Sequence, residues 1–155
     1  MKLEIERKFL VTGDGWRAGT PHHIVQGYLA RTEQASIRVR CSNARAWLSV
    51  KAARQGIARP EFEYAIPLDE AKELLTLCGT WRIEKTRYEV MHDGMLWEVD
   101  EFEGANTGLV VAEIELEHPS QTFTPPPWLG AEVTDDPRYY NAHLGQTPYT
   151  EWATS

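Results

Sequence analysis

The sequence predicts a mainly β protein of the α+β class, an eight-stranded antiparallel closed barrel with a few flanking helices. Strand-like segments in which charged and apolar side chains alternate recur along most of the chain. Turn-forming residues separate these segments at regular intervals, and only two stretches have helical character. Eight antiparallel strands can close into a barrel, which leaves no sheet edge exposed.

Length and charge limit the kind of protein this is. The 155 residues favour one domain spanning residues 1–155. A net charge of −7 is unfavourable for binding nucleic acid, which requires a basic surface. No apolar run approaches the roughly 20 residues that span a membrane, and charges from Lys2 onward argue against a signal peptide. We therefore expect a cytoplasmic protein without a nucleic-acid or membrane partner, either a monomer or a homodimer.

The strands follow from alternation and from the turns between them. Residues 12–15 (Thr-Gly-Asp-Gly) end the first strand, and residues 42–45 connect a hairpin. Asp93-Gly94 is a strong signal for a two-residue hairpin turn. The expected strands are Lys2–Val11, His23–Arg31, Ala35–Cys41, Ala46–Ala52, Arg59–Pro67, Trp81–Met91, Met95–Phe102 and Gly108–Glu117.

Two segments read as helices. Residues 69–79 combine a possible capping residue, Asp69, with a glycine at the C-terminal end. Its apolar face toward the sheet would consist of Leu74, Leu75, Leu77 and Cys78. After the proline-rich stretch 124–128, which excludes regular structure, a short helix is expected from residues 134–137 to about Leu144. The two cysteines lack metal-site spacing and are expected to stay reduced.

Seven of the eight predicted strands, all but His23–Arg31, have one charged and one apolar face, because alternate side chains point in opposite directions. Two arrangements fit: charges outside around an apolar interior, or an inverted barrel whose charges line a lumen. Like charges such as Arg38 and Arg40 share a strand and repel each other unless something binds between the charged sets. The charged face contains Glu4, Glu6, Lys8, Arg38, Arg40, Lys51, Glu61, Glu63, Lys85, Arg87, Glu98, Asp100, Glu113, Glu115 and Glu117.

A charged lumen implies the chemistry of its ligand. Basic side chains from several strands suit a ligand with many anionic oxygens, and arginine makes bidentate contacts with phosphate. Clustered carboxylates suit hard divalent cations such as Mg²⁺ or Mn²⁺. A chain of phosphates with bound metal satisfies both sets. The glycine-rich phosphate-binding motifs GxxxxGK and GxGxxG are absent from the sequence.

Residues Glu4 to Lys8 form an ExExK motif, and further charged motifs follow it in order along the chain. In this respect the sequence resembles the triphosphate tunnel metalloenzymes, also called the CYTH domain family, over nearly its whole length. Segments 26–29 and 126–128 resemble the small bacterial members that hydrolyse inorganic triphosphate. The further motifs are Ile37–Arg40, Leu48–Lys51, Glu61–Glu63, Glu84–Arg87, Glu98–Asp100 and Glu113–Glu115.

The resemblance implies an eight-stranded tunnel with a charged lumen and Mg²⁺- or Mn²⁺-dependent hydrolysis of inorganic triphosphate (tripolyphosphate) to pyrophosphate and phosphate. The residues that would bind this substrate are Lys8, Arg38, Arg40, Lys51, Lys85 and Arg87. A metal that also contacts the phosphates would be held by Glu4, Glu6 and Glu113. A second metal, near the attacking water, would be held by Glu61 or Glu63, Asp100 and Glu115.

Tyr28 is the candidate proton acceptor in this scheme, activated by the ammonium of Lys51 if their strands lie close. Alternatively, Tyr28 packs at the tunnel mouth and binds phosphate. Arg59 shares the charged parity but is expected to face solvent at its strand end. Alternative functions are a nucleoside or thiamine triphosphatase, a class IV-type adenylyl cyclase and a non-catalytic polyphosphate binder.

Overall fold

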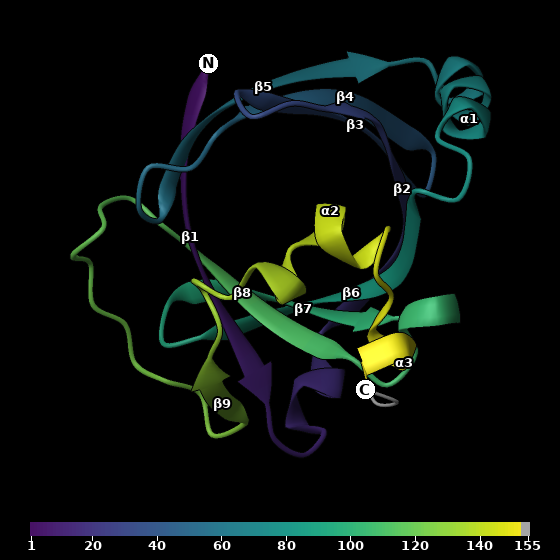
Figure 1. Ribbon diagram of the computed structural model, residues 1–155. Helices are drawn as coiled ribbons and strands as arrows, with labels where there is room; N and C mark the ends of the chain where they lie inside the picture. The colour runs from purple at the N-terminus through teal and green to yellow at the C-terminus, as the bar shows by residue number, and fades with distance from the viewer. Residues whose placement is uncertain (153–155) are drawn as a thin grey trace.

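Nine antiparallel strands make up the computed structural model, which describes residues 1–152 (Figure 1). Eight of them close into a ring in the order β1-β8-β7-β6-β2-β3-β4-β5 and back to β1, and β9 extends the sheet beside β1. The strands are β1 (Lys2–Val11), β2 (Thr20–Arg31), β3 (Ala35–Ser42), β4 (Arg45–Ala52), β5 (Ala58–Ile66), β6 (Arg82–His92), β7 (Met95–Phe102), β8 (Val110–Leu116) and β9 (Leu129–Glu132).

The barrel closes where β1 meets β5. The start of β1 pairs with β5, with Lys2 opposite Glu61 and Ile5 opposite Ala58. Its other edge pairs with β8 from Ile5 to Leu10. The predicted eight-stranded closed barrel is therefore confirmed, and β9 is an additional strand that the sequence did not indicate.

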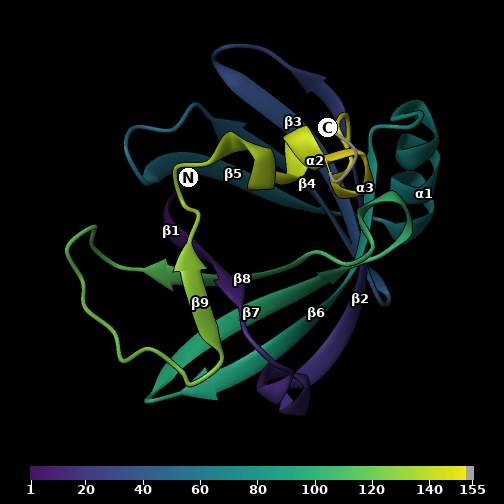
Figure 2. The same cartoon turned by 60° about the horizontal axis from the view of Figure 1, so that its bottom comes forward.

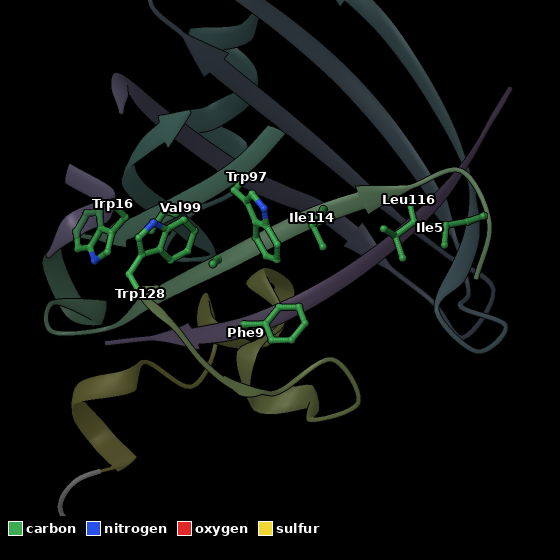
Figure 3. Close-up of a cluster of buried hydrophobic side chains, with 9 residues drawn as sticks. Ile5, Phe9, Trp16, Trp97, Val99, Ile114, Leu116 and Trp128 are labelled. Atoms are coloured by element: carbon green, nitrogen blue, oxygen red, sulfur yellow. The ribbon is translucent and has the colours of Figure 1, made fainter. Parts of the chain in front are cut away.

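The apolar faces of β1, β7 and β8 point outward and are covered by other parts of the chain (Figure 3). Trp97 packs edge-on against Phe9 and Trp128, with ring centroids 5.8 and 5.7 Å apart. The short 3-10 helix η1 (Gly15–Ala18) adds Trp16, which is also buried. The main core therefore lies outside the barrel wall, between the strands and the segment that leads into β9.

On the opposite side, α1 (Leu68–Leu77) covers the outer face of β2, β3 and β4. Leu75 packs there in a buried cluster on the outer face of these strands. Gly27 on β2 permits this approach, because a Cβ atom there would lie 2.6 Å from Cys78 Sγ. Two helix predictions were wrong: Asp69 lies in the first turn after an N-cap at Pro67, and Leu77 is 72% exposed.

The predicted C-terminal helix is interrupted. A 3-10 turn, η3 (Pro137–Tyr139), is followed by an extended Tyr140 and then by two short helices, α2 (Asn141–Leu144) and α3 (Tyr149–Trp152). Seen along the barrel, α2 lies inside the ring of strands (Figure 1), and in the turned view it lies toward one end of the barrel (Figure 2). Leu144 is fully buried in a cluster with apolar side chains of β6, β7 and β8. The C-terminal segment therefore packs into one end of the barrel.

The cysteines and the helix lengths bear on the predictions of reduced thiols and of no membrane-spanning segment. Cys41 and Cys78 are both free thiols. The longest helix of residues 1–152, α1, has ten residues, and none of the described helices has the length and hydropathy required to span a membrane.

Candidate active site in the barrel lumen

A cavity of about 460 Å³ occupies the lumen, and its walls are mostly charged. The inverted arrangement is therefore the correct one, with charges inside and the apolar faces outside. Thirteen of the fourteen candidate site residues line this cavity: Glu4, Glu6, Lys8, Tyr28, Arg38, Arg40, Lys51, Glu61, Glu63, Lys85, Arg87, Glu113 and Glu115. The fourteenth, Asp100, is fully buried behind the lining.

Strand register brings the charges together, because residues directly opposite each other on antiparallel strands share a face. Lys8 on β1 lies opposite Glu113 on β8. Lys51 on β4 lies opposite Glu61 on β5. Each of the eight barrel strands thus contributes between one and four charged residues to the lining, and the closed barrel collects them around a single space.

Asp100 anchors two of the basic side chains. Lys85 Nζ lies 2.7 Å from one Asp100 oxygen, and Arg87 donates two hydrogen bonds to the carboxylate at 2.7 and 2.9 Å. Burial opposes its ionisation, but the charges of Arg87 and Lys85 lower the pKa of Asp100 to about 2. Burial lowers the pKa of Lys85 to about 7 despite its contact with Asp100. This trio forms a preorganised basic wall of the cavity.

Arg38 and Arg40 lack carboxylate partners. Among residues 1–152 neither guanidinium has an acidic group within 4.0 Å, and the buried Nε of Arg38 has no hydrogen-bond partner. Burial, followed by the charges of Arg38 and Arg87, lowers the pKa of Arg40 to about 9. Arg40 Nε donates to Gln26, whereas a buried charged donor without a partner such as Arg38 Nε is costly, so its surroundings are suited to an anionic ligand.

Carboxylates are crowded on the other side of the cavity. Glu113 contacts Lys8 Nζ at 2.7 Å, and Glu6 lies 3.3 Å from the same nitrogen. Burial and the neighbouring Glu113 raise the pKa of Glu6 to about 7. Glu4 belongs to the same group. Burial opposes the ionisation of Glu4, but the charges of Lys51 and Arg59 lower its pKa to about 2. The oxygen atoms of these carboxylates are the ligands that a hard divalent cation prefers.

The remaining predicted carboxylates are more dispersed. Glu61 lies 3.4 Å from Lys51 Nζ, whereas Glu63 accepts only a long hydrogen bond of 3.5 Å from Ser49. Glu115 pairs with Lys2 at the exposed rim of the cavity, at 2.7 Å. These three groups line the cavity but do not form one compact cluster with the acidic group around Glu6.

Tyr28 and Lys51 line the same cavity, but no hydrogen bond joins them in the described chain. Tyr28 is 6% exposed and stacks on Trp81 with ring centroids 5.3 Å apart. The amine of Lys51 contacts Glu4 at 3.1 Å and Glu61 at 3.4 Å. Burial, with the charge of Arg38, lowers the pKa of Lys51 to about 8.

Sequence reasoning missed several lining residues. Arg59 was expected in solvent, yet it lines the cavity and its Nε lies 3.4 Å from a Glu4 oxygen. Its parity with Glu61 was the available signal. Gln26 is fully buried and donates to Asn141 of α2, which lines the cavity. Asn141 lies outside any strand pattern, so no periodicity could have indicated it.

A second cavity, of about 500 Å³, lies beside the turn between β3 and β4. It shares four charged residues with the first cavity: Arg40, Glu63, Arg87 and Glu98. The charged lumen therefore extends toward this end of the barrel, whereas residues 140–142 lie against the first cavity from the C-terminal segment.

Comparison with known proteins supports an assignment to a family. The model of the CYTH domain matches residues 2–140. An inorganic triphosphatase of Acetivibrio thermocellus is 47% identical over 151 residues, covering 96% of this chain and 97% of the relative. An inorganic triphosphatase of Nitrosomonas europaea is 39% identical over 147 residues, covering 91% and 95%.

Solved structures agree with the fold. The crystal structure of an inorganic triphosphatase aligns with a TM-score of 0.67 at 37% identity and covers 91% of this chain and 96% of its own. A protein from Pyrococcus horikoshii aligns with a TM-score of 0.58 at 18% identity, covering 75% and 80%, and supports the fold alone. With its closed barrel, its charged lumen and relatives that align along almost their full length, this chain belongs to the CYTH domain family.

Proposed function

We propose that this protein hydrolyses inorganic triphosphate to pyrophosphate and phosphate inside the barrel. The supporting observation is the pair of arginines in the lumen, Arg38 and Arg40, which have no carboxylate partner among residues 1–152 in a cavity that several carboxylates also line. An anion that also brings divalent cations would satisfy both walls. The two relatives described above as inorganic triphosphatases support the same substrate.

The basic side chains would bind the phosphate oxygens. Arg38 and Arg40 are available for bidentate contacts, and Asp100 holds Lys85 and Arg87 toward the cavity. Asp100 is buried beneath Lys85 and Arg87. Its position is therefore better suited to orienting these two cations than to binding a metal. The substrate-binding set remains Lys8, Arg38, Arg40, Lys51, Lys85 and Arg87.

Members of this family depend on a divalent metal, and we propose Mg²⁺ or Mn²⁺ here. Glu4, Glu6 and Glu113 would hold the ion, because Glu6 and Glu113 both contact Lys8 Nζ, Glu4 lines the same cavity and the surroundings oppose the ionisation of Glu6. Glu61, Glu63 and Glu115 are candidates for a second ion. When bound, the metal would offset the negative charge of the phosphate oxygens.

In the proposed reaction, water attacks a terminal phosphorus in line with the departing pyrophosphate. The arginines and lysines hold the substrate and stabilise the charge that develops on its oxygens, so that positioning and electrostatics provide most of the rate. Tyr28 accepts the proton of the attacking water, and Trp81 fixes its ring by stacking. Lys51, proposed as its catalytic partner, lines the same cavity.

The decisive experiment is phosphate release from tripolyphosphate with Mg²⁺ or Mn²⁺. Wild-type protein is compared with Glu4→Ala and with Glu70→Ala, which removes the same charge from the exposed surface of α1. We expect fast release by wild type and Glu70→Ala, with loss of activity in Glu4→Ala.

ATP and thiamine triphosphate serve as competing substrates. Hydrolysis of either one faster than tripolyphosphate would identify the protein as a nucleoside or thiamine triphosphatase. Cyclic AMP as a product would identify a cyclase. Tight binding without phosphate release under any metal condition would identify a polyphosphate binder.

We further propose that the chain acts as one domain in the cytoplasm, without nucleic-acid or membrane partners, as a monomer or homodimer. The two free thiols support a reducing compartment, and the net charge of −7 supports the absence of a nucleic-acid partner. Size-exclusion chromatography with light scattering would distinguish a monomer from a dimer.

A further inference from the structure

Two uncharged amides connect the C-terminal segment to the basic wall. Asn141 Oδ1 accepts hydrogen bonds from Lys85 Nζ at 2.9 Å and from Gln26 Nε2 at 3.1 Å. Gln26 is fully buried, and its Oε1 accepts a hydrogen bond from Arg40 Nε at 2.8 Å. A continuous network therefore runs from Arg40 through both amides to Lys85.

Contacts outside this network fix the position of Asn141. Trp81 Nε1 donates to the carbonyl of Ala142 at 2.8 Å, and Leu144 is buried in the barrel end. Arg54 donates to the carbonyl of Thr134 at 3.0 Å and also contacts the Tyr140 hydroxyl. The backbone on both sides of Asn141 is thus held independently of its own side chain.

The amides of Asn141 and Gln26 hold Lys85 and Arg40 without cancelling their positive charge, as a carboxylate would. A carboxylate beside Lys85 and Arg40 would hold the two cations but would also neutralise charge needed for an anionic ligand. The amide oxygens orient both cations without adding negative charge. Without Asn141, Lys85 would keep only Asp100 as a close partner among residues 1–152, and Gln26 would lose the bond that fixes its amide.

We infer that Asn141, acting directly on Lys85 and through Gln26 on Arg40, is a positioning residue that sets these two cations for binding triphosphate. The inference rests on the proposed function for the identity of the anion. It assigns the C-terminal segment a role in substrate binding in addition to its packing in the barrel end.

The test compares Asn141→Ala with Asn106→Ala. Asn106 also holds the C-terminal segment, since its side chain accepts from the backbone of Tyr149 and donates to the carbonyl of Leu144, but it does not line the cavity. Binding of tripolyphosphate is measured by titration calorimetry in EDTA, and KM and kcat are measured with Mg²⁺ or Mn²⁺. Thermal unfolding reports the stability of each variant.

We expect Asn141→Ala to weaken binding and raise KM about tenfold, the usual effect of losing a hydrogen bond to a charged group, with a smaller change in kcat. Asn106→Ala should lower thermal stability and leave tripolyphosphate affinity at the wild-type value. Wild-type affinity in Asn141→Ala, or an equal loss in both variants, would show that the segment is only structural.

Gln26→Met provides a second route if Asn141→Ala does not fold, because it leaves the C-terminal sequence intact and preserves side-chain volume. We expect it to raise KM as well, and unchanged affinity in this folded variant would overturn the inference. In the double variant, the combined loss should be smaller than the product of the single losses, because both act through one network. Calorimetric binding without hydrolysis by the wild type would count against the proposed function alone and leave this comparison valid.

Discussion

Glu6 is a residue whose ionised form is opposed by its surroundings. Its pKa is raised to about 7 by burial and by the nearby Glu113. In the unfolded chain the carboxyl group ionises near its ordinary value, so the folded state binds an extra proton between these two pH values. Stability from this group is therefore present at low pH and is lost as the pH rises from about 4.5 toward 7.

The first prediction concerns Glu6→Gln in metal-free protein. At pH 8 the variant should be more stable than wild type by on the order of 3 kcal/mol, because the unfavourable charge is gone. At pH 5 the difference should fall to about 1 kcal/mol, since folded wild-type Glu6 is then mostly protonated while the unfolded carboxyl is partly ionised. Urea unfolding in EDTA at both pH values measures this. An equal difference at both pH values would show that ionisation of Glu6 is not responsible.

The second prediction concerns Tyr28. If the phenolic oxygen of Tyr28 accepts the proton of the attacking water, Tyr28→Phe should lower kcat for tripolyphosphate by about 10²-fold or more, while KM changes little. The stacking on Trp81 does not require the hydroxyl, so the fold should be preserved. Steady-state kinetics measures both constants. A raised KM with unchanged kcat would instead identify Tyr28 as a phosphate-binding residue.

At the scale of elements, the sequence pattern predicted the place of α1 correctly but only part of its buried face. The helix was expected at this place, and Leu75 faces the sheet as predicted, with 5% exposure. Leu77 was assigned to the same face, but it is 72% exposed. Two residues further along, a helix has turned by about 200°, so these leucines lie on nearly opposite sides.

The third prediction uses this difference as a matched pair. Leu75→Ala should reduce the free energy of unfolding by about 2–5 kcal/mol, because it leaves a cavity between α1 and the strands it covers. Leu77→Ala should change it by no more than about 0.5 kcal/mol, as is usual for an exposed position. Urea unfolding of both variants provides the comparison. Equal effects would mean that α1 is rotated relative to the structure described here.

The C-terminal elements were predicted less well, for a local reason. Thr134, Asp136 and Pro137 indicate a helix start, and Asp136 does accept from the backbone of Arg138. The helix then stops because Tyr140 is extended, and Leu144 becomes buried in the barrel end. Burial of a few apolar side chains inside the barrel outweighs the modest preference of this short segment for a continuous helix.

At the scale of the whole molecule, the barrel holds two sets of charges whose ligands should support each other. Metal bound among the carboxylates would reduce repulsion for the phosphates, and bound phosphates would supply further oxygens to the metal. Because thermodynamic coupling is reciprocal, each ligand should bind more tightly in the presence of the other.

The fourth prediction follows from this coupling. Ca²⁺, or another divalent ion that does not support turnover, and tripolyphosphate should together raise the midpoint of thermal unfolding by more than the sum of their separate effects. A ligand at about 100 times its Kd stabilises the folded state by about 2.7 kcal/mol. Differential scanning fluorimetry with each ligand and with both measures the effect, and Glu4→Ala should abolish the synergy. Additive shifts would indicate independent sites.

The sequence by itself determined the eight strands of the barrel and the charged set, because each follows from local alternation of side chains and from turn residues. Glu4, Glu6 and Lys8 share one face of β1 whatever surrounds the strand. The ordered charged motifs indicated the family, and through it the lumen and its ligand.

Alternation is the same for a normal and an inverted barrel, so it left open which face points inward, and the tertiary structure shows the charged face inside. It also decided that Asp100 lies behind Lys85 and Arg87, and that Arg59 and Asn141 reach the cavity. These outcomes depend on which segments, distant in the sequence, cover the outside of the barrel and which enter one end of it. Contacts between such segments are set by packing and charge across the closed barrel, and local periodicity contains no information about them.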